Sequence, residues 1–176
     1  MVAVVFSDTA RGSEGGRTFV AELRRRVPDV AVFNIDGMNS GILSKNVLSA
    51  VDSAERVIVV AESVPNPRRT TQGHEGGSVG LDMGPAQLLA SILKSDSDKT
   101  VVAAFGNPYI GSGVQGIGSY VCTFSNTPVS ALSLVAALFG EMPIHGHLPV
   151  SIPGMAQLGA GLDRDAMTAR FGPPRN

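Results

Sequence analysis

The residues best suited to chemistry lie in one polar loop, Ser63–Gly84 (SVPNPRRTTQGHEGGSVGLDMG). Arg68 and Arg69 offer paired N–H donors to a carboxylate, a phosphate or the hydroxyls of a sugar, and His74 and Glu75 follow them as titratable groups. A solvated surface loop explains the same composition. We therefore treat these four residues as candidates for ligand contact and not as an assigned site.

Other reactive residue types have simpler explanations. Cys122 is the single cysteine, which excludes an internal disulfide, and it falls in a strand pattern where a thiol is usually a small core residue. A nucleophile would instead lie on a sharp strand-to-helix turn with a base in reach. His145 and His147 form an H-x-H pair with one nearby carboxylate, Glu141. That is too small a ligand set for zinc, so we expect loop histidines and no metal.

The turn Ser7–Arg17 (SDTARGSEGGR) is the remaining candidate for ligand binding. A glycine-containing turn before a helix can hold a phosphate at the helix N-terminus. This turn matches neither G-x-G-x-x-G nor the P-loop, however, and lacks the lysine of the latter. We expect a flexible connection between a strand and a helix, and no cofactor.

The elements that must position these residues alternate along the chain. Short apolar, β-branched runs are apolar on both faces, as strands of a parallel sheet covered by helices must be. Between them, apolar residues recur at helical spacing. Five strands are predicted at Val2–Phe6, Val30–Ile35, Arg56–Ala61, Thr100–Phe105 and Tyr120–Phe124, and the helical runs are Phe19–Val27, Leu43–Val51, Leu88–Leu93 and Leu132–Phe139.

Helix punctuation supports this assignment. Pro85 and Pro128 are predicted at first helical positions, with Thr127 as an N-cap, and Gly140 as the stop of the last helix. The order implies a three-layer α/β/α sandwich with a mostly parallel, flavodoxin-like sheet of about five strands. Because ligands bind at the carboxyl ends of such strands, the loop after the third strand lies at the expected edge.

Composition narrows the class of protein. The 176 residues include 43% hydrophobic and 16% charged ones, which suits a single domain over 1–176 with a buried core. A net charge of −1 favours neither a nucleic-acid nor an anionic-membrane partner. The sequence contains no run of about 18 apolar residues, so we expect no transmembrane helix. The N-terminus shows no signal peptide, so we expect a mature form or an excised domain if the parent protein is exported.

The C-terminal extension, 141–176, contains the most distinctive pattern. Ala137–Gly154 reads ALFGEMPIHGHLPVSIPG. Its first four residues end the last helix, and the remainder is predicted to be an ordered, non-helical segment whose backbone is restricted by prolines. We expect Leu148–Ile152 to be extended and able to add an edge strand, because its prolines fall near the ends.

An ordered series of motifs resembles a known family. It comprises F-G-N-P-Y at Phe105–Tyr109, T-F-S-N-T at Thr123–Thr127, and the A-L-F-G-E-x-P-I-x-G-x-L-P-V-S-I-P-G end. This series resembles the C-terminal α/β sandwich domain of family-3 glycoside hydrolases, in the β-N-acetylglucosaminidase-like branch. In that family a separate (β/α)8 barrel carries the aspartate nucleophile, and retaining hydrolysis also needs an acid/base.

The resemblance implies that this chain lacks both catalytic groups. In the β-glucosidase branch, the sandwich supplies a glutamate from the loop that leads into its last helix. Here that stretch is Ser125–Ser130 (SNTPVS), with no carboxylate and with Ser130 nearest the equivalent position. Glu75 lies after the third strand and not in this stretch. Either the parent enzyme takes its acid/base from a histidine on a barrel loop, or the domain is non-catalytic.

Both alternatives imply the same partner and role. We expect the chain to pack on a (β/α)8 barrel, to meet carbohydrate through that barrel, and to shape the substrate cleft through Arg68, Arg69, His74 and Glu75. We expect no glycosidase activity from it alone. A free-standing flavodoxin-like module for small-ligand binding or dimerisation is the alternative from another class of function.

Overall fold

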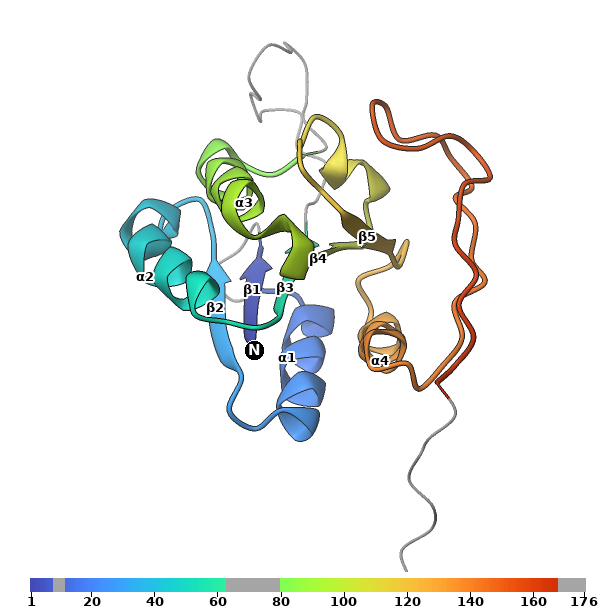
Figure 1. The fold of residues 1–176 in the computed structure, drawn as a ribbon, viewed down its shortest axis with the longest axis horizontal. Coiled ribbons are helices and arrows are strands. Elements are labelled where there is room, and N and C mark those ends of the chain that lie inside the picture. Colours follow the sequence, from blue (N-terminus) through green and yellow to red (C-terminus); the bar gives the residue numbers. More distant parts are fainter. Residues whose placement is uncertain (8–11, 63–79, 168–176) are drawn as a thin grey trace, which may run out of the picture.

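Five parallel strands form the central sheet, in the order β2-β1-β3-β4-β5 (Figure 1). The structure is a computed structural model and describes residues 1–7, 12–62 and 80–167. All four strand pairings are parallel, which confirms the predicted sheet. The strands are β1 Val2–Phe6, β2 Ala31–Ile35, β3 Val57–Glu62, β4 Thr100–Phe105 and β5 Ser119–Cys122.

Helices cover both faces of the sheet and give the predicted three-layer sandwich. On one face α1 packs beside α4, and on the other α2 packs beside α3. The helices are α1 Glu14–Arg26, α2 Ser40–Asp52, α3 Met83–Asp96 and α4 Pro128–Leu138, with short 3₁₀ helices η1 Ser97–Lys99 and η2 Pro108–Gly111.

The two central strands explain why the sheet is buried on both sides. Every residue of β1 and β3 is buried. Alternate side chains of β1 enter different cores: Val4 and Phe6 face α2 and α3, whereas Ala3 and Val5 face α1 and α4. Continuous apolar runs are therefore required here, since alternation would leave polar groups under one helical layer.

The ends of α4 follow their local sequence. Thr127 is the N-cap and Pro128 the first helical residue, as predicted. At the other end Gly140 has φ 69° and donates to Ala137 O at 3.0 Å, while Glu141 N donates to Ala136 O at 2.8 Å. This pair of bonds is a Schellman motif, which requires a left-handed residue after the helix.

Two helical details differ from the prediction. Helix α3 begins at Met83, so Pro85 is its third residue and not its first. In α4, Leu132 is 45% exposed, because the helix turns Ala131 and Leu134 toward the sheet in its place.

Residues 140–167 form a long two-legged arm after α4, coloured orange to red in Figure 1. Backbone hydrogen bonds of 2.7 or 2.8 Å join the legs at every fourth residue: Met167 N to Gly140 O, Ile144 N to Arg164 O, Leu148 N to Ala160 O, and Ile152 N to Ala156 O. The edge strand expected at Leu148–Ile152 is not part of the sheet. Its Leu148 and Ile152 amides donate to the returning leg and cannot also pair with β5.

The arm is fixed at its tip. Ile152 is 1% exposed, and Ser112 Oγ donates to Pro153 O at 3.3 Å. A Cβ on Gly111 would lie 2.7 Å from Met155 Cε, so the tip packs closely on η2. The arm thus continues the fold beyond α4 along the side of β5.

Candidate functional site

The sheet changes direction between β1 and β3, and this point organises its carboxyl edge. From β1 the chain moves outward to β2, whereas from β3 it moves to β4 and β5 on the other side. Open α/β sheets bind ligands in the crevice at such a point. Ser7 follows β1 here, and Glu62 ends β3.

Glu62 is a buried carboxylate, 5% exposed, at the centre of this edge. Ser13 Oγ donates to Glu62 Oε1 at 2.6 Å and Ser13 N donates to Oε2 at 3.3 Å. Ser13 is also the N-cap of α1 and accepts from Gly16 N at 2.8 Å. The carboxylate therefore lies behind the N-terminus of α1, where the helix dipole favours negative charge.

Two glycines allow α1 to approach this carboxylate. A Cβ on Gly16 would lie 2.8 Å from Glu62 Oε1, and one on Gly15 would collide with the carbonyl of Asn126 in the loop before α4. The prediction of a flexible connection through Arg17 is wrong for Glu14–Arg17, which form the first turn of α1. These glycines are there because two other segments contact the helix backbone.

Glu62 is not among the predicted site residues. The apolar pattern predicts the third strand at Arg56–Ala61, one residue short of this position. The available signal was an acidic residue directly after an unbroken apolar run, because such a run predicts burial on both faces. The Ser13 partner could not be identified in the same way, since 49 residues separate the two.

The loop into α4 contains hydroxyl groups that bond to one another and to the backbone. Thr123 Oγ1 donates to Ser125 O at 2.6 Å, and Thr127 Oγ1 lies 3.2 Å from Ser125 Oγ and 3.3 Å from Ser130 Oγ. Ser130 is in the first turn of α4. No residue of 125–130 is acidic, so this stretch offers hydroxyl groups and no carboxylate.

A groove of about 400 Å³ lies beside this edge, between α1 and the end of β2. Strand β2 is at the edge of the sheet and its Asn34 is exposed, so α1 does not cover this part of the strand. Arg17 and Arg24 line the groove from α1, and Asp36 lines it from the loop after β2.

The other predicted residues have separate places. Cys122 ends β5 and packs against the core under α3, where burial raises the pKa of its thiol to about 11. Tyr120 lies nearby: burial raises its pKa too, and its hydroxyl donates to Pro108 O at 2.8 Å. A thiol with this pKa is protonated near neutral pH and is a poor nucleophile.

The histidine pair lies on the exposed arm. His145 Nδ1 is 3.2 Å from Asp163 Oδ1, and His147 Nδ1 is 3.2 Å from His145 O. Within residues 1–7, 12–62 and 80–167, no group of three or more histidine, cysteine or acidic side chains could hold a metal. Among the helices of the same residues, none combines the length and apolar character needed to cross a bilayer.

The four residues predicted to contact a ligand, Arg68, Arg69, His74 and Glu75, lie outside the described residues. Their place relative to Glu62 and to the groove stays a prediction. Only the ends of their segment are positioned, by Glu62 in β3 and by Gly80 before α3.

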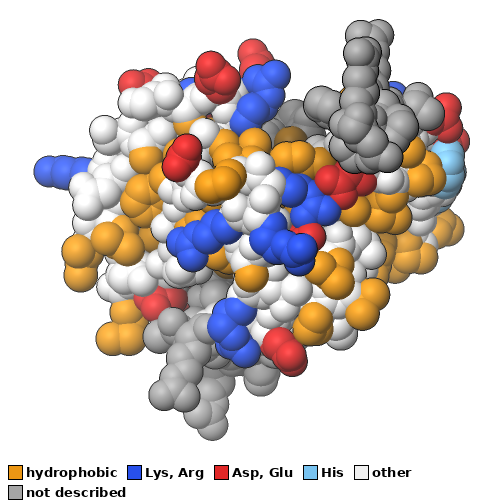
Figure 2. Space-filling model, turned by 90° about the horizontal axis from the view of Figure 1, so that it is seen from below, with side chains coloured by type: hydrophobic (Ala, Val, Ile, Leu, Met, Phe, Trp, Pro, Cys, Tyr) orange, Lys and Arg blue, Asp and Glu red, His pale blue; other side chains and the backbone are white. Residues whose placement is uncertain are grey.

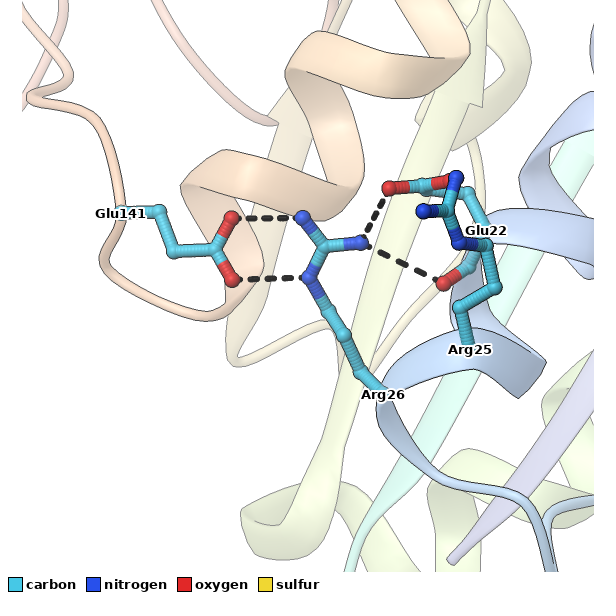
Figure 3. Close-up of polar contacts among 4 residues, drawn as sticks. All are labelled: Glu22, Arg25, Arg26 and Glu141. Carbon is cyan, nitrogen blue, oxygen red and sulfur yellow. Dashed lines mark hydrogen bonds and ion pairs between the residues drawn. The ribbon is translucent and has the colours of Figure 1, made fainter. Parts of the chain in front are cut away.

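An ion-pair cluster joins α1 to the base of the arm (Figure 3). Arg26 Nε and Nη2 donate to the two carboxylate oxygens of Glu141 at 2.7 and 2.6 Å, and Nη1 contacts Glu22. The guanidinium also lies 5.7 Å from the centre of the Phe139 ring. Hydrogen bonds from Arg26 lower the pKa of Glu22 and Glu141, and these carboxylates raise the pKa of Arg26.

Charges of both signs are mixed on the surface seen from below Figure 1. Basic and acidic side chains lie next to one another there, with hydrophobic side chains between them (Figure 2). This visible part of the described surface presents no extended patch of one sign, as a phosphate-backbone partner would require.

Comparisons with known proteins establish the fold. No protein-family model matches the chain, and no curated protein matches it. Among solved structures it is similar to a fungal multi-domain GH3 β-N-acetylglucosaminidase, described as containing a GCN5-related glucosamine N-acetyltransferase region. The TM-score is 0.62 at 19% identity, over 91% of this chain and 16% of that chain. A likeness of this kind supports the α/β architecture, and function must be argued separately.

Proposed function

We propose that this chain is an accessory α/β domain of a family-3 glycoside hydrolase and packs on a separate (β/α)8 catalytic barrel. The observation that carries the proposal is the match of 91% of this chain to 16% of a multi-domain GH3 enzyme chain. The motif series that ends in G-x-L-P-V-S-I-P-G supports it independently, because it resembles the sandwich domain of the same family.

The domain contributes architecture and not the reacting groups. The loop 125–130 offers hydroxyls in place of a carboxylate. Glu62 is buried and accepts two hydrogen bonds from Ser13 at the N-terminus of α1. Those bonds tie Glu62 to the residue that caps α1, so its role within this proposal is to position that helix.

The segment with Arg68, Arg69, His74 and Glu75 is assigned to the substrate cleft within this proposal. It follows β3, whose carboxyl end lies at the edge where open α/β sheets meet ligands. Guanidinium groups there would donate hydrogen bonds to sugar hydroxyls held by the barrel.

An activity assay tests the catalytic half of the proposal. The chain is incubated alone with a chromogenic N-acetylglucosaminide and a chromogenic glucoside, beside the E75Q and E62Q variants. We expect no turnover above the buffer rate for any of the three proteins. Turnover by the unmodified chain that disappears in E75Q would assign an acid/base to this domain and would overturn its accessory role.

A further inference from the structure

The geometry points to a second site: we propose that the groove between α1 and β2 binds a small organic anion, a phosphate- or carboxylate-bearing molecule, through Arg17 and Arg24. This proposal does not depend on the glycosidase assignment. It concerns a different part of the carboxyl edge from Glu62 and uses residues that lie on described elements.

The two arginines form the basic wall of the groove. They are seven residues apart on α1, two helical turns, which places them on one side of the helix about 10 Å apart along its axis. Arg17 Nη1 donates to Gly12 O at 3.2 Å, and both residues line the groove. Guanidinium groups bind carboxylates and phosphates through paired N–H donors.

Arg24 differs from the arginines that follow it. Arg25 pairs with Glu22, and Arg26 pairs with Glu22 and Glu141. In the described part of the chain Arg24 has no hydrogen bond or ion pair, yet it lines the groove. Its donors are therefore available to a ligand, whereas those of its neighbours already have carboxylate partners.

The opposite wall is polar and locally fixed. Asp36 Oδ1 accepts from Met38 N at 2.9 Å and from Asn39 N at 2.8 Å, and Asn39 Oδ1 accepts from Asp36 N at 2.9 Å. These bonds hold the loop after β2 in one conformation and offset part of the charge of Asp36. Among the lining residues Asp36 supplies a carboxylate, and Arg24 supplies a guanidinium group that has no ion-pair partner in the described part of the chain.

Apolar side chains also line the groove, which indicates a ligand with a carbon skeleton. Val5 of β1 and Val20 of α1 are among them. Its volume of about 400 Å³ is in the range of small-molecule sites. An anionic head at the arginines and a compact body on the valines would use both features.

Nuclear magnetic resonance titration tests this site. The protein is titrated with sodium phosphate and, separately, with sodium acetate, at ionic strength held constant with chloride. Backbone amides of Gly12, Gly16 and Asn34 report on the groove. The R24Q variant removes the free guanidinium, and R25Q on the same helix changes the net charge equally without lining the groove.

We expect saturable shifts of the groove amides with at least one anion, and the stronger anion identifies the head group. R24Q should weaken binding about tenfold, as for loss of a charge-assisted hydrogen bond, and R25Q should leave it within about twofold. D36N keeps the Oδ1 acceptor but removes a negative charge, so it should tighten binding. Absence of saturation with both anions, or equal losses in R24Q and R25Q, would overturn the proposal.

Discussion

At the scale of single residues, Glu62 and the glycine beside it decide how α1 meets the sheet. The carboxylate accepts hydrogen bonds from Ser13, and Gly16 leaves the space in which Oε1 lies. A buried carboxylate without these donors would be costly, so the contact and the N-cap depend on each other.

Substitution of Gly16 tests this dependence. In G16A the new methyl group would lie 2.8 Å from Glu62 Oε1, and either the carboxylate or the first turn of α1 must move. We expect a loss of about 1–3 kcal/mol in the free energy of unfolding, measured by urea denaturation.

The matched control is G41A in α2. A Cβ on Gly41 meets nothing within 4 Å, so alanine there should stabilise the protein by roughly 0.5–1 kcal/mol through helix propensity. If G16A were as stable as G41A, the close approach of α1 to Glu62 would be refuted.

Single-residue roles were the hardest part to predict from sequence. Cys122 could be placed in the core because its strand neighbours are apolar. The Ser13–Glu62 contact could not, because the two residues come together only through the parallel pairing of β1 with β3. The groove arginines were missed for a related reason: Arg24 belongs to a basic run, and only the fold separates it from Arg25 and Arg26.

At the scale of elements, the arm of residues 140–167 begins directly at the Schellman motif that ends α4. The Schellman motif at Gly140 redirects the chain, and Met167 returns to donate to Gly140 O at 2.8 Å. A Cβ on Gly140 would lie 2.5 Å from Met167 Cε, so this glycine is required both for its φ of 69° and for the contact.

Three glycines in the arm separate these two effects. G140A should destabilise the protein most, by about 1–3 kcal/mol, because it combines left-handed strain with a collision. G159A, at φ 81° with nothing within 4 Å, should show the strain alone, and G146A, with neither feature, should be nearly neutral. Thermal denaturation gives the order, and a G146A as unstable as G140A would contradict the described packing of the arm.

The Arg26 cluster makes the base of the arm sensitive to acid. The pKa values of Glu22 and Glu141 are lowered in the folded state, so their contribution is present above the ordinary value of 4.5 and is lost as the pH falls below it. We expect amide exchange in the arm near Glu141 to accelerate relative to the sheet below about pH 4.5.

R26Q provides the comparison for this effect. It removes the guanidinium group that Glu22 and Glu141 share. The arm amides should therefore exchange faster already at neutral pH, and little further acceleration should follow below about pH 4.5. R25Q, whose partner bond to Glu22 is exposed, should behave like the unmodified protein. An acid response unchanged in R26Q would assign it to other carboxylates.

Helices and strands could be predicted where the spacing of apolar residues coincides with a residue that marks the end of an element. Gly140, predicted as the stop of the last helix, is such a residue. The pairing of the arm was not predictable, since proline and glycine indicate an extended chain without naming its partner. In the structure, Leu148–Ile152 pairs with the returning leg of the arm and not with β5.

At the scale of the whole molecule, the fold positions three distinct features along one sheet. Glu62 fixes α1 at the carboxyl edge, the groove opens beside β2, and the arm runs along the side of β5.

The sequence was sufficient for the architecture and insufficient for the surface that a partner would contact. Parallel strands buried on both faces must be covered by helices, so the three layers follow from the apolar runs. Leu158 and Leu162, for example, are 66% and 70% exposed on the arm. Their exposure is set by the path of the returning leg, which no local pattern encodes.

Association with a barrel is the most direct test of the proposed role. The chain is mixed with the isolated (β/α)8 barrel of the family-3 glycoside hydrolase from the same source, and light scattering after size exclusion gives the mass of the complex. We predict a complex with one copy of each and no glycosidase activity in the fraction of this chain alone. Separate elution of the two proteins at concentrations well above micromolar would contradict the assignment of this chain as an accessory domain.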